Sequence, residues 1–297
     1  MRLIPPSLVL VLLIAAVATG DVAAQEVVRV DEPTWLILER GRLAFDSREF
    51  GEALRLFRAV KERNSTMPEV DFEIGRVFEA EGEMELALMQ YERAYERKEL
   101  MIVPDDAIDL LYRLARLRET REDYLQHEQL LRTIIEEIDD RFAQSPSRLE
   151  EPLYRLLTTD GLDKLVELYR FYDSGSQRAY HLLSRTLLYH GRRYIEASKY
   201  AAISIVMTLT EIIEFARYID PEYEFSGTEW LIATTRRFSS VGDYIEEAAL
   251  YDQLYVLGHA LFLSDRLIPA ESVRQLLIRI DPGGKTGYRA ARGYPPL

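Results

Sequence analysis

The residues of this sequence best suited to chemistry are a short Gly-Lys-Thr motif and a few histidines. Gly283-Gly284-Lys285-Thr286 resembles the end of a phosphate-binding loop, but that loop needs a glycine at Arg279, a strand before it and a helix after it. The histidines lack zinc-ligand spacing and no Gly-x-Ser-x-Gly turn frames a nucleophile; they are His127, His181, His190 and His259. The sequence therefore predicts no catalytic residue, no metal and no cofactor, and favours a protein that is not an enzyme.

Three arginines recur at a regular spacing. Arg42, Arg76 and Arg116 are separated by steps of 34 and 40 residues. Each directly follows a small residue, namely Gly41, Gly75 or Ala115. A guanidinium group presents five N–H donors in a planar fork, which suits carboxylates and backbone carbonyls. A shared binding role requires a repeated element that places all three alike.

An internal repeat of 34 residues supplies such an element. Aligning the chain from Thr34 with the chain from Pro68 pairs Gly41 with Gly75, Ala53 with Ala87 and Phe57 with Tyr91. A third copy follows at a shift of 40, with Ala115, His127, Leu131 and Ile134 at the matching places. Small residues let two helices approach closely, and large ones fill the space between neighbouring pairs. The repeat therefore predicts antiparallel helix pairs.

This pattern resembles the tetratricopeptide repeat (TPR). Gly41, Ala53 and Phe57 match it in the first copy, where Arg40 replaces the usual leucine. The second copy matches at Ile74-Gly75, Phe78, Ala87, Tyr91 and Ala94. The resemblance implies an all-α fold, namely a TPR-like α-solenoid in which antiparallel helix pairs form a right-handed superhelix.

The resemblance also implies a peptide-binding groove on the concave face, because the residue after the small one faces it in this family. The predicted groove residues are Trp35, Leu38, Arg42, Phe45, Phe72, Arg76 and Arg116. Family members that grip a carboxyl terminus use a Lys and Asn clamp, whereas Leu38 and Arg42 occupy the first two clamp positions here. A second interpretation stays open, in which each arginine pairs with a nearby Glu39, Glu73 or Glu79 and only keeps the surface soluble.

Beyond residue 140 the pattern is more divergent. Asp139 to Ser147 interrupts the repeat, which predicts TPR-like repeats over 34–140 and a divergent helical region over 141–280. Gly191 with Ala197, and Gly258 with Ala270, resemble further copies, and Gly242-Asp243-Tyr244 suggests another inter-helix turn. The Gly- and Pro-rich residues 281–297 predict a flexible tail.

The N-terminus has the layout of a secretory signal. Arg2 precedes the apolar run Leu8 to Ala18, and Val22 and Ala24 offer small side chains for cleavage. We expect a signal peptide over 1–24 and a short linker over 25–33. The apolar run is shorter than the roughly 20 residues that span a bilayer, so we expect no stable membrane span after cleavage, although a retained anchor is the alternative.

Composition narrows the partners and the compartment. The formal charge is −13, with 37 Lys plus Arg against 50 Asp plus Glu, which disfavours nucleic acid as a partner. The chain has no cysteine, so an acylated lipoprotein and a disulfide scaffold are both excluded. These features favour a bacterial periplasm, with an extracellular location as the alternative.

The leading hypothesis is an exported scaffold or adaptor that binds a protein or peptide segment in its groove. The alternatives are the helical superstructure of a cell-envelope enzyme, or an accessory subunit of a transport or outer-membrane assembly system. The sequence names neither the partner nor the oligomeric state, and the convex face stays open as the binding face.

Overall fold

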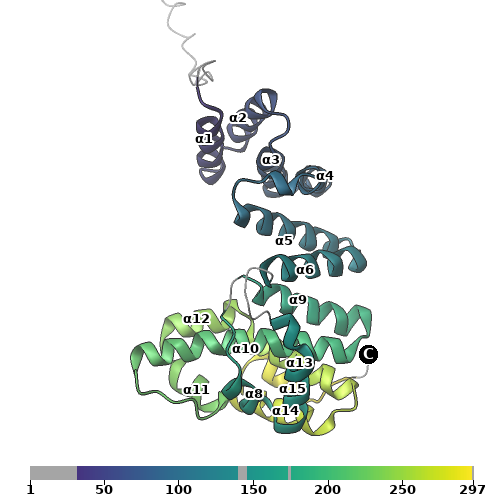
Figure 1. Cartoon of the computed structure of the whole chain (residues 1–297), viewed down its shortest axis with the longest axis vertical. Coiled ribbons are helices and arrows are strands. Elements are labelled where there is room, and N and C mark those ends of the chain that lie inside the picture. The colour runs from purple at the N-terminus through teal and green to yellow at the C-terminus, as the bar shows by residue number, and fades with distance from the viewer. Residues whose placement is uncertain (1–31, 140–145, 173–174, 296–297) are drawn as a thin grey trace, which may run out of the picture. The chain divides into compact units, whose positions relative to one another are not determined.

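The computed structural model describes residues 32–139, 146–172 and 175–295. The predicted signal peptide and most of the predicted linker lie outside these ranges. Within them the chain forms fifteen α-helices and no strand, which confirms the all-α prediction (Figure 1).

The helices are α1 (Thr34–Asp46), α2 (Phe50–Arg63), α3 (Pro68–Ala80), α4 (Met84–Tyr95), α5 (Pro104–Thr120), α6 (Tyr124–Asp139), α7 (Glu150–Asp160), α8 (Leu162–Leu168), α9 (Gln177–Thr186), α10 (Tyr194–Ile219), α11 (Thr228–Thr235), α12 (Ser239–Glu247), α13 (Leu250–Leu263), α14 (Leu267–Ile280) and α15 (Lys285–Ala291). Two short 3₁₀ turns, η2 (Lys98–Leu100) and η3 (Pro146–Leu149), and one π turn, η4 (Leu187–Gly191), join them.

The helices divide into two compact units. The first ends at Ala87 and the second begins at Leu88, inside α4. The sequence predicted the division at residues 140 and 141 instead, and residues 140–145 lie outside the described ranges. The right-handed superhelix stays a prediction.

In the first unit α1 packs on α2 and α2 packs on α3. Pro68 opens α3, where its missing N–H costs nothing, and Glu69 and Asp71 place negative charge in the first turn. The apolar faces meet in one core; its buried residues are Ile37, Leu38, Ala44, Ala53, Leu56, Phe57, Val60, Val70, Ile74 and Val77. A Cβ on Gly41 would lie 2.4 Å from the Phe57 ring, so the glycine is what admits the ring.

Five inter-helix turns share one backbone geometry, which identifies five repeats. Each turn has one residue with positive φ; these residues are Arg48, Gly82, Glu122, Arg192 and Asp265. In four of the five turns the N–H that follows donates to the carbonyl five residues before it, as from Glu49 to Ala44 at 2.8 Å and from Arg266 to Leu261 at 2.9 Å. This is the hydrogen bond of a Schellman motif. Five residues after each positive φ stands a buried side chain of the second helix: Ala53, Ala87, His127, Ala197 or Ala270.

The fourth turn contains one extra residue. There the bond runs over six residues, from Arg193 N–H to the Leu187 carbonyl, because η4 is a π turn. The small residue of this repeat is therefore Ser184, thirteen residues before Ala197, and it is fully buried. Gly191 precedes the turn before α10, as the sequence predicted.

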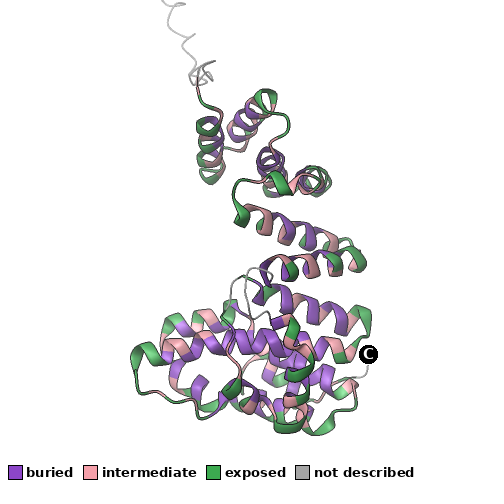
Figure 2. Cartoon of the chain, in the orientation of Figure 1, coloured by how far each residue is buried: buried purple, intermediate pink, exposed green. Residues whose placement is uncertain are grey.

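The second unit is built around α10. The pairs α5 with α6, α9 with α10 and α13 with α14 are repeats, while α7, α8, α11 and α12 are additional and all contact α10. Every residue from Tyr200 to Thr210 is buried, and Figure 2 shows α10 largely in the colour of buried residues. Gly242 lies inside α12, so the inter-helix turn predicted at this glycine is wrong.

The predicted flexible tail is also wrong for residues 285–295. Lys285–Ala291 forms α15, and Tyr294 packs against Gly258, where a Cβ would lie 1.7 Å from its hydroxyl oxygen. His259 Nε2 donates to the Pro295 carbonyl at 2.7 Å. The reason lies in the last repeat, which has Arg274 where the first two have Phe57 and Tyr91. Tyr294 fills the space that an aromatic ring of α14 would have taken.

Candidate functional site

Six of the seven predicted groove residues lie in the first unit. Trp35, Leu38, Arg42 and Phe45 are on α1, and Phe72 and Arg76 are on α3. Trp35 is 64% exposed. Leu38 and Phe72 are buried in the protein interior, so neither offers the apolar contact surface that the groove hypothesis assigned to it.

The arginines of the first unit converge on one buried carboxylate. Glu73 is 1% exposed; its Oε1 accepts from Arg42 Nε at 2.6 Å and its Oε2 from Arg76 Nη1 at 2.9 Å. Arg42 also reaches Glu39 at 3.0 Å, and the Arg76 guanidinium lies 4.5 Å from the centre of the Phe45 ring. The alternative interpretation, in which these arginines pair with Glu39 and Glu73, is what the structure shows for both.

Arg116, the third predicted arginine, belongs to the second unit. It lies exposed on α5, and its carbonyl accepts from the Thr120 hydroxyl at 2.9 Å. Arg42 and Arg76 therefore share Glu73 within the first unit, whereas Arg116 lies in the second.

The repeat register identifies three further residues of this kind in the second unit. Counted from Ser184, the residues Arg178, His181 and Arg185 hold the places that Trp35, Leu38 and Arg42 hold relative to Gly41. Tyr112 holds the place of Leu38 in the third repeat. Sequence reasoning missed all four as site residues, and for Arg178, His181 and Arg185 the reason is the π turn, which shifts the fourth repeat by one residue. Counting thirteen residues back from Ala197, instead of twelve, would have found the small residue.

These residues line a cavity of about 410 Å³ between α5, α9 and α12. The three helices are labelled in Figure 1. Its lining consists of Tyr112, Gly175, Gln177, Arg178, His181, Leu182, Arg185, Tyr244, Glu247, Ala248 and Ala249. The volume is in the range of ligand-binding pockets, and aromatic and aliphatic walls surround a few charged groups, as is usual for such pockets.

The two arginines of the cavity have different partners. The Arg178 guanidinium lies 5.1 Å from the centre of the Tyr112 ring, and the Tyr112 hydroxyl donates to the Gly175 carbonyl at 2.7 Å. Within the described ranges no carboxylate forms an ion pair with Arg178. Arg185 Nε lies 3.7 Å from Asp252 Oδ2, which is too far for a good hydrogen bond.

Asp252 is bound mainly by His181, whose Nε2 lies 3.3 Å from Oδ2. Burial raises the pKa of Asp252, but the hydrogen bond from His181 and the charges of Arg185 and Arg289 outweigh burial and hold the pKa below its ordinary value. His181 itself is 6% exposed, and its Nδ1 has no hydrogen-bond partner among the described residues. A residue of the cavity wall therefore carries an unused polar atom beside two arginines.

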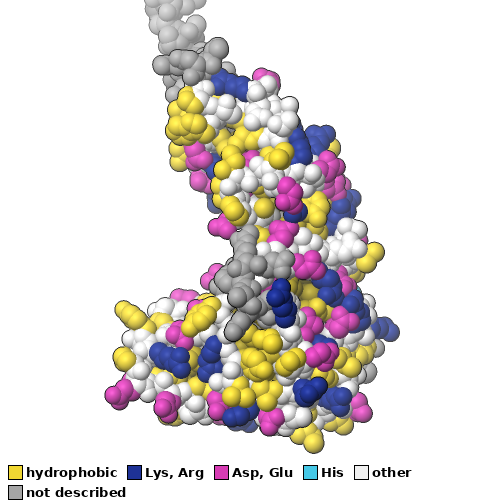
Figure 3. Space-filling model, viewed as in Figure 1, with side chains coloured by type: hydrophobic (Ala, Val, Ile, Leu, Met, Phe, Trp, Pro, Cys, Tyr) yellow, Lys and Arg dark blue, Asp and Glu magenta, His cyan; other side chains and the backbone are white. Residues whose placement is uncertain are grey.

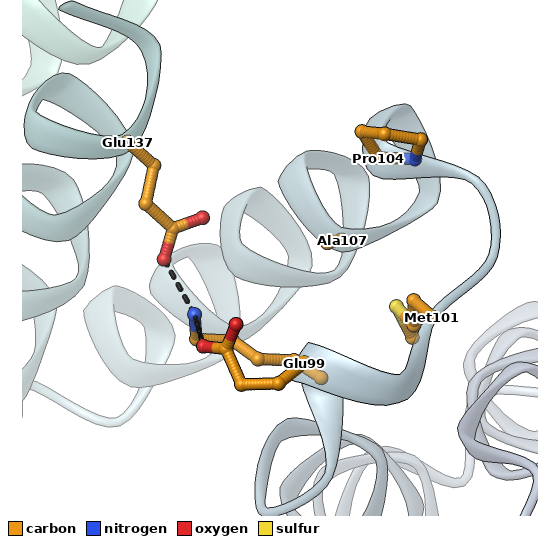
Figure 4. Close-up of a pocket in the computed structure, with 6 residues that line it drawn as sticks. Glu99, Met101, Pro104, Ala107 and Glu137 are labelled. Carbon is orange, nitrogen blue, oxygen red and sulfur yellow. Dashed lines mark hydrogen bonds and ion pairs between the residues drawn. The ribbon is translucent and has the colours of Figure 1, made fainter. Parts of the chain in front are cut away.

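A second hollow, of about 300 Å³, lies at the connection of η2 and α5 (Figure 4). Lys98 Nζ donates to Glu137 at 2.6 Å and to Glu99 at 2.7 Å. Burial lowers the pKa of Lys98, but these two hydrogen bonds outweigh it and raise the pKa above its ordinary value. The lysine is neutralised by its own chain, so this hollow is a structural joint and a weaker candidate than the cavity.

Other site types find no support in the described part of the chain. No three His, Cys, Asp or Glu residues there come together as metal ligands would. No helix of the described ranges combines the length and apolar character needed to cross a bilayer. Figure 3 shows acidic and basic side chains interspersed on the visible face of the second unit, without the broad basic patch that nucleic acid requires.

Comparison with known proteins gives two distant relatives. An uncharacterized protein of Treponema pallidum is 23% identical over 233 residues, covering 77% of this chain and 61% of that protein. An uncharacterized protein of Borreliella burgdorferi is 19% identical over 255 residues, covering 77% of this chain and 78% of that protein. The chain thus spans about three fifths of the Treponema protein. No family model matches.

Two solved structures share helical regions with the chain. An assembly chaperone of RpL4 (Acl4) is 14% identical, covering 88% of this chain and 98% of its own, with a TM-score of 0.30. The C-terminal part of a TPR repeat-containing protein from Cytophaga hutchinsonii is 12% identical, covering 85% and 98%, also with a TM-score of 0.30. At this TM-score neither guides the assignment of a partner, and the TPR-like description rests on the five turns.

Proposed function

We propose that the chain is an exported adaptor that binds an acidic segment of another protein in the cavity between α5, α9 and α12. The observation that carries the proposal is the state of its arginines: Arg178 lines the cavity without a carboxylate partner among the described residues, and Arg185 lines it with one long ion pair, to Asp252 at 3.7 Å. A charge-assisted hydrogen bond from a guanidinium to a ligand carboxylate is among the stronger polar contacts available to a protein.

The first unit supports a different role for its own arginines. Glu73 already occupies the fork of Arg42 and one N–H of Arg76. An acidic ligand there would have to displace a buried carboxylate, which is costly because the carboxylate would lose its partners. The binding site is therefore assigned to the second unit, and Trp35 remains an exposed contact point of the first.

The first experiment is site-specific crosslinking in the native cell. A photoreactive residue at Leu182, which lines the cavity, should capture one protein, whereas the same residue at Leu125, which is exposed on α6, should not. Adding Arg178→Glu and Arg185→Glu should abolish the capture at position 182. Capture that survives the double charge reversal would contradict the proposal.

The affinity is then measured with the captured segment as a synthetic peptide. Arg178→Glu with Arg185→Glu should raise the Kd at least tenfold, about 1.4 kcal/mol. The matched control is Arg58→Glu with Arg93→Glu, which reverses the same number of charges at exposed arginines on α2 and α4 and should change the Kd less than twofold. A similar effect of both changes would show that net charge alone, and no specific site, governs binding.

Export to a bacterial periplasm is part of the proposal and rests on the N-terminal pattern and the absence of cysteine. The intact mass of the protein isolated from its native cells tests it. A chain that begins at Gln25 supports cleavage after Ala24, and a chain that retains residues 1–24 contradicts it.

A further inference from the structure

The cavity has walls of opposite charge. Helix α9 contributes Arg178 and Arg185, and helix α12 contributes Glu247 and the ring of Tyr244. Glu247 is exposed and forms no ion pair with any side chain of the described residues, so the opposite charges face one cavity without neutralising each other. A ligand that enters meets Arg178, which has no carboxylate partner among the described residues, on one side and Glu247 on the other.

The acidic wall is held in place by a buried polar network. The Ala248 carbonyl, directly after Glu247, accepts from Gln177 Nε2 at 3.3 Å and from Gln253 Nε2 at 2.5 Å. Gln177 and Gln253 are both bound to the Thr208 hydroxyl as well, at 3.2 and 3.1 Å. Fully satisfied buried networks of this kind specify a single arrangement.

The backbone after Glu247 is also strained. Ala249 has a φ of 56°, in the left-handed region that an alanine rarely adopts. Strained residues persist where the surrounding structure over-determines them, and they concentrate at functional sites. The hydrogen bonds of the two glutamines to the Ala248 carbonyl hold this backbone and, with it, the end of α12 that carries Tyr244 and Glu247.

The spacing of the arginines suits a short extended segment. Arg178 and Arg185 are seven residues apart on α9, so they lie about 10 Å apart along its axis. An extended segment spans that distance with about three residues, whereas a helix would need about seven.

From these observations we infer that the cavity selects a dipolar extended segment, with an acidic side chain against Arg178 and Arg185 and a basic side chain against Glu247. This inference rests on the proposed function and adds the specificity of the same site. Glu247 disfavours segments that carry only acids, because a like charge in a partly enclosed cavity is repelled. The arginines disfavour segments that carry only bases.

The test uses a phage-displayed library of random dodecapeptides, selected on the full purified chain and on two variants. The wild type should enrich peptides that contain an acidic and a basic residue within a few positions. Glu247→Gln should enrich acidic peptides without the basic residue, and Arg178→Gln with Arg185→Gln should lose the acidic residue. Circular dichroism and thermal unfolding confirm that each variant is folded.

A charge swap makes the test quantitative. For the best wild-type peptide, Glu247→Lys should raise the Kd at least tenfold, and replacing the basic residue of the peptide by Glu should restore binding to that variant. Gln253→Met, which removes the donor to the Ala248 carbonyl, should reduce the preference for dipolar over acidic peptides at least threefold while acidic peptides still bind.

The outcomes separate the two proposals. Acidic peptides that bind the wild type as tightly as dipolar ones overturn the dipolar selectivity and leave the adaptor function standing. A library that yields no peptide whose binding depends on Arg178 and Arg185 overturns both.

Discussion

The two units carry arginines at equivalent places of their helix pairs but treat the charges differently. In the first unit Glu73 binds Arg42 of the preceding repeat and Arg76 of its own helix. In the second unit the corresponding Arg185 has a longer ion pair with Asp252, at 3.7 Å, and Arg178 has an aromatic ring. The first unit binds both arginines to one buried carboxylate, whereas the second leaves Arg178 at a cavity without a carboxylate partner among the described residues.

The same contrast holds for the aromatic rings beside the helix glycines. Gly41 receives Phe57 from its own repeat, whereas Gly258 receives Tyr294 from beyond the last repeat. Likewise α12, which contributes Tyr244 and Glu247 to the cavity wall, is inserted between the repeats α9–α10 and α13–α14. Repeats whose side chains pair with one another have few groups available to a ligand. Segments added to the repeats create cavities and expose charges.

The largest expected effect concerns the carboxylates of Glu73 in the first unit and Glu247 in the second. Glu73→Ala should lower the free energy of unfolding by about 2–3 kcal/mol, because two half-buried arginines lose the buried carboxylate that they share. Glu247→Ala should change it by less than about 0.5 kcal/mol, since this carboxylate is exposed and unpaired within the described residues. Urea unfolding measures both. Equal costs would remove the distinction between the units.

The next effect concerns the glycines. Gly41→Ala should cost about 2 kcal/mol, because the new methyl group overlaps the Phe57 ring in the core. Gly258→Ala should cost about 1–2 kcal/mol by releasing Tyr294, and amide hydrogen exchange should accelerate at residues 285–295 only. Gly51→Ala is the control: its Cβ meets nothing within 4 Å, so the helix should gain stability. If amide exchange in Gly258→Ala accelerates throughout α13, the packing of Tyr294 cannot be lost without also loosening that helix.

A smaller effect is a pH dependence confined to the second unit. Burial lowers the pKa of His259 below 6.5, against the hydrogen bond to Pro295 that raises it. The unfolded chain therefore takes up this proton first, so the stabilisation is complete above pH 6.5 and is lost as the pH falls through the lowered pKa. His259→Gln keeps a side-chain N–H donor but does not titrate.

The measurement is unfolding of wild type and His259→Gln between pH 7.5 and 5.5. The wild type should lose up to about 1 kcal/mol more than the variant over this range, with exchange accelerating at residues 285–295. Parallel pH profiles would contradict a titrating role for His259.

The smallest effect should not distinguish the units at all. The positive-φ residue of every turn suits glycine best, so Glu122→Gly in the second unit should gain about 0.5 kcal/mol and Gly82→Ala in the first should lose about 1 kcal/mol. Chemical denaturation resolves both. A turn that responds with the opposite sign would show that its geometry differs from that of the other repeats.

The sequence by itself determined the helix pairs. Small residues at Gly41, Ala53, Gly258 and Ala270 recur because two helices can approach closely only where side chains are small, and that requirement is written locally in each repeat. For the same reason the all-α fold could be predicted, together with the pairing of Arg42 and Arg76 with glutamates as one of two interpretations.

Only the tertiary structure decided where the open charges lie. The π turn at Leu187–Gly191 shifts the fourth repeat, the Ala248 carbonyl fixes α12 over the cavity, and Tyr294 fills a place left by Arg274. Each of these depends on contacts between residues far apart in the chain, which no local periodicity encodes. Whether an arginine is bound by its own protein or free for a ligand is settled by such contacts, because its charge looks the same in the sequence in either case.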